Sequence, residues 1–203
     1  MNTPPALNLF IIGPSGCGKS TQAKLIADKY NLTHLSMGQL LRDQIAAKSP
    51  LGLQAQKFVN AGKWAPNELV LKILIDTLDK KVNNHNFIID GFPRLLNQGQ
   101  QVQKHLDKNH QGFSLLILLA VTFAEINARR AKMGQDFQSK DRSDSTLKAV
   151  AARQLSYDST IKPILVHYQQ QDKLFTVDGN RPIEPIFSDI CQKIDNLLIS
   201  KIS

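Results

Sequence analysis

The sequence has little cysteine and no long apolar run. Only Cys17 and Cys191 occur among 203 residues. This excludes a disulfide framework and a four-cysteine zinc site; a single bridge stays open, but we expect reduced thiols. The most apolar run, SLLILLAV from Ser114, is far too short to cross a bilayer. The N-terminal MNTPPALNLFII lacks the basic residues and apolar stretch of a secretory signal. We therefore expect one soluble domain in the cytoplasm.

Aromatic residues are also scarce, at 6% of the chain. The 25 basic and 17 acidic residues give a formal charge of +8, which favours an acidic partner, either a nucleic acid or a polyphosphate. The basic residues are scattered rather than blocked, and no RNA-binding or DNA-binding module is recognisable. We expect a polyphosphate pocket, and no nucleic-acid or membrane partner.

Short apolar segments alternate with longer segments of helical period. We expect strands at residues 7–13, 33–36, 86–90, 114–121 and 173–178. Helical spacing is found after the glycine-rich loop, at Ala23, Ile26, Ala27 and Tyr30, and again over residues 66–78 and 183–194. Strands that alternate with helices predict crossover connections and a parallel sheet. The expected fold is α/β, with three layers: a central five-stranded parallel sheet and helices on both faces.

The segment FIIGPSGCGKSTQ, from Phe10, contains the pattern G-x-x-x-x-G-K-[ST] at Gly13, Gly18, Lys19 and Ser20. It lies between an expected strand and an expected helix, which is the context that identifies a P-loop. The glycines let successive backbone N–H groups turn toward anionic oxygens, and the helix N-terminus points the same way. Lys19 would reach the β- and γ-phosphates of a nucleoside triphosphate, and the Ser20 hydroxyl would bind Mg²⁺. We therefore expect a P-loop NTPase fold.

Two segments follow the second and third expected strands, HLSMGQLLRDQ and IIDGFPRLLNQGQQ, and a third, TVDGNRPIEPIF, follows the last. Together with the P-loop, they resemble the motifs of the nucleoside monophosphate kinases, the adenylate kinase family above all. The resemblance covers nearly the whole chain, in the same order. It implies reversible, Mg²⁺-dependent phosphoryl transfer from ATP to AMP, giving two ADP, by a monomer of the short-lid type.

The resemblance also implies roles for single positions. ATP is expected at Gly13, Ser15, Gly16, Cys17, Gly18, Lys19, Ser20, Thr21, Arg129 and Arg181. AMP is expected at Met37, Arg42, Trp64, Gly91, Arg94, Gln98, Arg142 and Arg153. The residues expected to assist catalysis are Lys19, Arg94, Arg129, Arg142 and Arg153. Mg²⁺ is expected at Ser20 and Asp90, largely through water. No structural zinc is implied, because the lid is short and lacks cysteines.

Some of these residues have other interpretations. Asp90 ends a strand opposite the P-loop, where such a metal is found, but a lone aspartate there is as often a turn former or helix cap. Trp64 could contact the acceptor base or be a packing residue. Asp144 could orient Arg142 or cap a helix. The thiol of Cys17 is assigned no role.

Two mobile parts are implied within the single domain of residues 1–203. One is a monophosphate-binding subdomain at about residues 36–66, and the other is a short lid at about 133–144. The polar stretch MGQDFQSKDRSDS, from Met133, suits either a plain surface loop or a flap over a phosphate site.

Four positions depart from the family pattern. Ser15 replaces a proline and Ser20 a glycine, while Met37 stands where adenylate kinases have threonine and pyrimidine monophosphate kinases have alanine. Met133 replaces a second arginine before the lid. Two alternatives stay open. One is a UMP/CMP kinase, because HLS, LLRD and RSD also occur in that group, and the other is a weakly active nucleotide-binding regulator, because of Met133.

Overall fold

The computed structural model describes residues 6–61, 63–81, 86–133 and 147–200. Its strands are β1 (Asn8–Ile12), β2 (Thr33–Ser36), β3 (Phe87–Asp90), β4 (Leu115–Ala120) and β5 (Leu174–Asp178). Its helices are α1 (Lys19–Tyr30), α2 (Met37–Ala46), α3 (Pro50–Asn60), α4 (Asn67–Lys81), α5 (Leu96–Lys108), α6 (Phe123–Met133), α7 (Leu147–Gln169) and α8 (Ile183–Ser200). All the strands expected from the sequence are present, within one or two residues of their predicted bounds.

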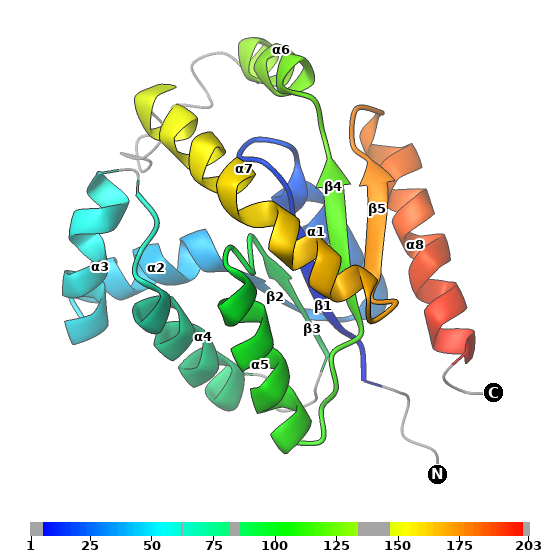
Figure 1. Cartoon of the computed structure of the whole chain (residues 1–203), viewed down its shortest axis with the longest axis horizontal. Coiled ribbons are helices and arrows are strands. Elements are labelled where there is room, and N and C mark those ends of the chain that lie inside the picture. Colours follow the sequence, from blue (N-terminus) through cyan, green and yellow to red (C-terminus); the bar gives the residue numbers. More distant parts are fainter. Residues whose placement is uncertain (1–5, 62, 82–85, 134–146, 201–203) are drawn as a thin grey trace.

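The strands form one parallel sheet in the order β2-β3-β1-β4-β5. Helices α1 and α8 cover one face, and α4, α5 and α7 cover the other (Figure 1). The three-layer α/β fold predicted from the alternating pattern is thus confirmed. Within the described part, no helix has both the length and the apolar composition needed to span a membrane. Cys17 and Cys191 are both free and buried.

Successive residues of the central strands face opposite helical layers, so both sides of each strand are apolar. On β1, Leu9 and Ile11 pack with α1 and α8, whereas Phe10 and Ile12 pack with the opposite layer. All four side chains are at most 2% exposed. This burial explains why residues 9–12 of β1 are all apolar and do not alternate with polar residues.

The register of β1 and β3 positions the two loops that follow them. Ile11 pairs with Asp90, and the N–H of Gly91 donates to the carbonyl of Ile11 at 3.0 Å. The loop after β1 and the loop after β3 therefore begin side by side at the carboxyl edge of the sheet, where open α/β sheets bind ligands.

Helices α2 and α3 pack on each other at the edge of the molecule (Figure 1). They occupy most of the predicted monophosphate-binding subdomain, whose mobility stays a prediction. Their crossing is close at Gly52, where an added Cβ would fall on the backbone carbonyl of Gln44 and 2.7 Å from the nitrogen of Ile45. The predicted lid, about 133–144, falls outside the described residues except for the end of α6.

Replacing Gly52 by alanine tests this crossing. The added methyl group meets backbone rather than a flexible side chain, so α2 and α3 must separate. We expect Gly52→Ala to lose about 3 kcal/mol of unfolding free energy, the upper end of the usual cost of overpacking, measured by urea denaturation. The control is Gly112→Ala, where φ is 52° but no atom lies within 4 Å, with an expected loss of about 1 kcal/mol. Equal stabilities of the two variants would contradict the close crossing.

Candidate active site

The P-loop joins β1 to α1, and its backbone has the tightly turned conformation that its glycines predict. Gly16 and Gly18 have φ angles of 88° and 101°, in the region that side chains disfavour. A Cβ at Gly13 would lie 2.7 Å from the carbonyl oxygen of Leu119 and 2.9 Å from the sulfur of Cys17. Glycine is therefore needed at position 13 for close packing of the loop on β4.

Lys19 is the first residue of α1, and its side chain folds back over the loop. Its ammonium donates to the carbonyl of Pro14 at 2.7 Å and lies 3.6 Å from the sulfur of Cys17. The cation is thus held over the P-loop by a neutral acceptor, which an anionic phosphate oxygen can replace with a stronger, charge-assisted bond.

Ser20 and Asp90 meet across the junction of β1 and β3. The Ser20 hydroxyl donates to Oδ2 of Asp90 at 2.5 Å, although the two residues are 70 positions apart. Asp90 is 5% exposed. A hydroxyl and a carboxylate beside a phosphate-binding loop are oxygen ligands of the kind Mg²⁺ takes, with phosphates and water completing its shell. The residues present therefore fit the metal that the resemblance implies.

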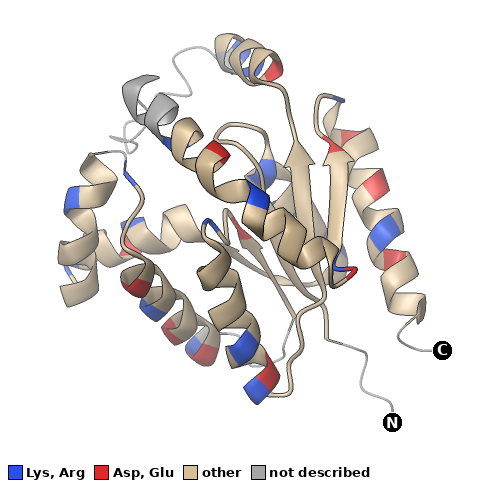
Figure 2. Cartoon of the chain, viewed as in Figure 1, with Lys and Arg blue, Asp and Glu red and all other residues tan. Residues whose placement is uncertain are grey.

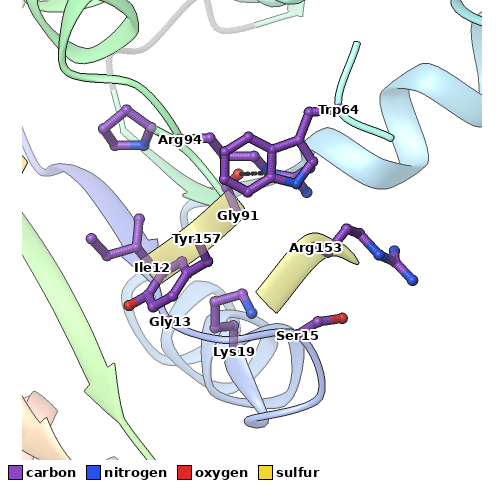
Figure 3. A pocket seen from close by; sticks show the side chains of 10 residues that line it. Ile12, Gly13, Ser15, Lys19, Trp64, Gly91, Arg94, Arg153 and Tyr157 are labelled. Carbon is purple, nitrogen blue, oxygen red and sulfur yellow. Dashed lines mark hydrogen bonds between the residues drawn. The ribbon is translucent and has the colours of Figure 1, made fainter. Parts of the chain in front are cut away.

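A recess opens between the P-loop and the loop after β3; we call it the phosphate recess (Figure 3). It holds about 460 Å³ of empty space, part of it open to solvent. Its lining comes from segments far apart in the sequence: Ile12, Gly13, Ser15, Lys19, Trp64, Gly91, Pro93, Arg94, Arg153 and Tyr157. Cationic side chains from the P-loop, the β3–α5 loop and α7 thus share one cavity.

Tyr157 is a member of the phosphate recess that the sequence analysis missed. It lies four residues after Arg153 on α7, so both are on the same face of that helix, and this spacing was the available signal. Burial raises the pKa of the Tyr157 phenol far above its ordinary value, with a smaller contribution from the nearby Cys17. The phenol is therefore neutral at physiological pH and serves as a wall of the recess.

A second recess adjoins the first; we call it the base recess. It is mostly apolar and holds about 400 Å³ of empty space, partly open to solvent. It is lined by Met37, Leu41, Trp64, Ala65, Val70, Gly91, Phe92, Arg94, Leu95 and Gln98. Trp64, Gly91 and Arg94 belong to both recesses. A ligand with a flat apolar part and an anionic part can therefore occupy the base recess and reach into the phosphate recess.

Arg94 and Trp64 form the boundary between the recesses. The guanidinium carbon of Arg94 lies 5.1 Å from the centre of the Trp64 ring, a cation–π geometry. The Nε of Arg94 donates to the carbonyl of Gly91 at 3.2 Å, the bond drawn in Figure 3. Behind them, Phe92 is fully buried and its ring meets Phe10 edge to face at 5.2 Å, which anchors the loop to β1.

Gln98 lies in the first turn of α5 and is 3% exposed. Its Oε1 accepts the backbone N–H groups of Arg94 at 2.9 Å and Leu95 at 3.3 Å. These two donors fix the orientation of the amide, because the flipped amide would face them with its own N–H groups. Among the described residues, Nε2 has no protein partner. The side chain therefore offers a hydrogen-bond donor, and not an acceptor, to a ligand.

Three of the predicted arginines lie outside both recesses. Arg42 donates to Oε1 of Gln39 in its own helix at 2.8 Å. Arg181 donates to Asp189 at 2.6 Å. Arg129 donates to the carbonyls of Cys17 at 2.8 Å and Gly179 at 2.5 Å, so it bridges the P-loop and the loop after β5.

Other predicted positions vary in how far the structure describes them. Arg142 and Asp144 lie outside the described residues, as does the side chain of Met133. Ser20 and Thr21 are exposed at the start of α1, and Cys17 is fully buried. The remaining ATP-binding predictions, Gly16 and Gly18, belong to the P-loop backbone.

The charged residues of the described part show no single basic face in the view of Figure 2. Lys and Arg alternate with Asp and Glu along α4, α5 and α8. Lys19, Arg94 and Arg153 come from three elements and line the phosphate recess. Lys19 and Arg94 place positive charge beside the P-loop, where a polyphosphate would bind, whereas the Arg153 guanidinium points away from Lys19 in the view of Figure 3.

A P-loop that shares one cavity with an arginine-bearing loop and an apolar base recess defines a P-loop phosphotransferase acting on a small phosphorylated acceptor. Comparison with known proteins identifies the family. The adenylate kinase family model matches residues 11–173, and the chain belongs to the adenylate kinase family. It is accordingly a nucleoside monophosphate kinase.

Several curated relatives are named adenylate kinase. One from Azobacteroides pseudotrichonymphae genomovar. CFP2 is 35% identical over 191 residues, covering 94% of this chain and 98% of the relative. One from Clostridium novyi (strain NT) is 30% identical, covering 93% and 99%. One from Bacteroides thetaiotaomicron is 33% identical, covering 94% and 100%. The resemblance noted in the sequence is thus confirmed, and none of these three relatives favours the pyrimidine kinase or regulator alternatives.

Removing the Lys19 ammonium tests the phosphate recess. Lys19→Met keeps the aliphatic stem but loses the charge that would face the phosphates. We expect kcat for phosphotransfer to fall at least about a hundredfold, comparable with the loss of one preorganised stabiliser of transition-state charge, with an unchanged unfolding midpoint. Lys24→Met, an exposed lysine of α1, is the control and should retain full activity. Undiminished kcat in folded Lys19→Met would refute the assignment.

Proposed function

We propose that the protein transfers the γ-phosphoryl group of Mg²⁺-bound ATP to AMP, giving two ADP, in a reversible reaction. The observation that carries this proposal is the shared cavity: the P-loop and the Gly91–Gln98 segment face each other in the phosphate recess, and the base recess opens from it. ATP on the P-loop and AMP in the base recess would bring their phosphates together there. The three relatives described above, each named adenylate kinase, support the same reaction.

The donor would be held by backbone N–H groups of the P-loop, with Lys19 moving from the Pro14 carbonyl to the β- and γ-phosphates. Ser20 and Asp90 would hold Mg²⁺, largely through water. When bound, this ion offsets part of the negative charge of the phosphates. The acceptor phosphate would lie against Arg94, and Arg42 would join it by leaving its Gln39 partner.

Phosphoryl transfer needs no nucleophilic side chain, because its loose transition state is stabilised by positioning and by positive charge around the equatorial oxygens. Arg153 supplies such charge from α7, and we expect Arg142 to act with it. The thiol of Cys17 is fully buried, and we assign it no part in the chemistry. The oxygen of AMP would attack the γ-phosphorus directly, in line with the departing ADP oxygen.

Water must be kept from the γ-phosphate, because its attack would hydrolyse ATP. Tyr157 and Trp64 are the large rings that line the phosphate recess, and both would displace water from it. Closure of the monophosphate-binding subdomain and lid would complete the exclusion. Both recesses are built within one chain, which supports a monomer; we place the enzyme in the cytoplasm.

The base recess would select adenine through the Nε2 donor of Gln98. Adenine N1 accepts a hydrogen bond, whereas guanine N1 and uracil N3 carry hydrogens and would face the amide donor to donor. Cytosine N3 is an acceptor, so CMP is the strongest competitor. CMP differs from AMP in having a smaller base, which would fill less of the apolar recess that Met37 helps to line.

An assay of ADP formation with four monophosphates tests the function. With ATP and Mg²⁺, we expect kcat/KM for AMP to exceed that for CMP by at least about tenfold, and those for GMP and UMP by more. Preference for CMP or UMP would overturn the adenylate assignment. Binding of ATP without transfer to any acceptor would overturn the kinase assignment.

A second series tests how the base is read. Purine riboside 5′-monophosphate lacks the 6-amino group but keeps N1, and we expect its kcat/KM to stay within about fivefold of that for AMP. The 1-deaza analogue of AMP should lose at least about tenfold, because the buried amide donor is left unpaired. Gln98→Glu keeps an oxygen that can accept from the N–H groups of Arg94 and Leu95 but loses the amide donor, so its kcat/KM for AMP should fall by a similar factor. Gln101→Glu, at an exposed residue of α5, should keep the kcat/KM of the parent. An equal loss for both analogues would contradict recognition of adenine through N1 alone.

A further inference from the structure

The guanidinium group of Arg129 is held by three different segments of the chain. Its Nε donates to Oε1 of Glu125 at 2.8 Å. Its Nη1 donates to the carbonyl of Cys17 at 2.8 Å, and its Nη2 to the carbonyls of Gly179 at 2.5 Å and Arg181 at 3.3 Å. The side chain therefore joins α6, the P-loop and the β5–α8 loop at one point.

The two loops that Arg129 joins have no strand pairing between them. The P-loop follows β1 and the other loop follows β5, and β4 lies between these strands in the sheet. Both loops pack on Leu119 of β4, since a Cβ at Gly13 would lie 2.7 Å from its carbonyl and one at Gly179 would lie 2.9 Å from its side chain. Arg129 adds direct hydrogen bonds that fix the separation of the loops.

We propose that Glu125 is a positioning residue for the ATP site, and that it acts only through Arg129. This inference rests on the proposed function, in which the P-loop holds the triphosphate of ATP, and on the expectation from the family resemblance that ATP also contacts Arg181 in the β5–α8 loop. An arginine side chain has several rotatable bonds, and its conformational freedom opposes any one placement. The carboxylate of Glu125, one helical turn earlier on α6, holds Nε and so directs both Nη atoms at the carbonyls.

The Glu125–Arg129 pair has a second possible effect, the ordinary stabilisation of a helix by an i,i+4 pair. The two side chains are 34% and 25% exposed, and partly exposed pairs of this kind contribute little to stability. If the pair only stabilised the helix, its removal would lower the melting temperature and leave ATP binding unchanged. A positioning role would weaken ATP binding and leave the melting temperature nearly unchanged.

The inference predicts a selective loss in Glu125→Gln. We expect the KM and the Kd for ATP to rise about three- to tenfold, while kcat and the KM for AMP stay within twofold. The Kd for inorganic tripolyphosphate should also stay within twofold, because this ligand occupies the P-loop without reaching the β5–α8 loop. Glu184→Gln, which removes an exposed first-turn glutamate of α8, is the charge-matched control and should bind ATP as the parent does.

A double-mutant cycle shows whether Glu125 acts through Arg129. Arg129→Met should weaken ATP binding at least as much as Glu125→Gln, and the double variant should bind ATP as Arg129→Met does. Additive losses, or ATP binding by Glu125→Gln equal to that of the parent, would overturn the inference. Because the Kd for ATP is measured without an acceptor, failure of the parent to phosphorylate AMP would overturn the proposed function separately.

Discussion

The hydrogen bonds between β1 and β3 hold together the two loops on which the chemistry depends. Ile11 pairs with Asp90, and the bond from Gly91 to Ile11 continues the ladder one step beyond the strands. A shift of this register by one residue would turn Asp90 to the other face of the sheet, away from Ser20. Both strands are fully buried, with apolar side chains packed in both helical layers, so the core itself fixes the register and with it the geometry of the phosphate recess.

Two cationic side chains of the site have protein oxygens as partners. Lys19 binds the Pro14 carbonyl, and Arg94 binds the Gly91 carbonyl. Phosphate oxygens can replace these neutral acceptors with shorter and stronger bonds, and the side chains do not have to be ordered from a fully mobile state. Arg129 differs, since its partners are a carboxylate and three carbonyls that together join separate segments. It is better suited to hold the ATP site in shape than to follow a phosphoryl group during transfer.

Local sequence patterns predicted the sheet and the P-loop well, because each depends on residues close together in the chain. The apolar runs of β1 and β3 and the spacing of Gly13, Gly18 and Lys19 are of this kind. Tyr157 was missed because its place in the phosphate recess depends on how α7 crosses the sheet. The hydrogen bonds that Gln98 accepts from the N–H groups of Arg94 and Leu95 were not predicted. A glutamine in this position suits contact with adenine, but it equally suits capping of the first turn of a helix.

The bridge made by Arg129 is another feature that local patterns do not contain. Its partners Cys17 and Gly179 are 162 positions apart, and they meet only because β1 and β5 flank β4. Glu125 precedes Arg129 by four residues, which predicts an ion pair on a helix but not what the other guanidinium nitrogens bind. The roles of Trp64 and Asp90 were open in the sequence. The structure puts Trp64 in both recesses and Asp90 beside Ser20.

The central claim is that ATP and AMP bind on adjacent loops of one cavity, with their phosphates meeting between Lys19 and Arg94. Calorimetric titration with diadenosine pentaphosphate, whose two adenosines are joined by a phosphate chain, tests this most directly. Occupation of both sites by one molecule makes the second contact intramolecular, which should tighten binding at least about a hundredfold over ATP alone. We predict one ligand per chain at that affinity, with a change in Trp64 emission. Two ligands per chain, or one bound no more tightly than ATP, would contradict the account.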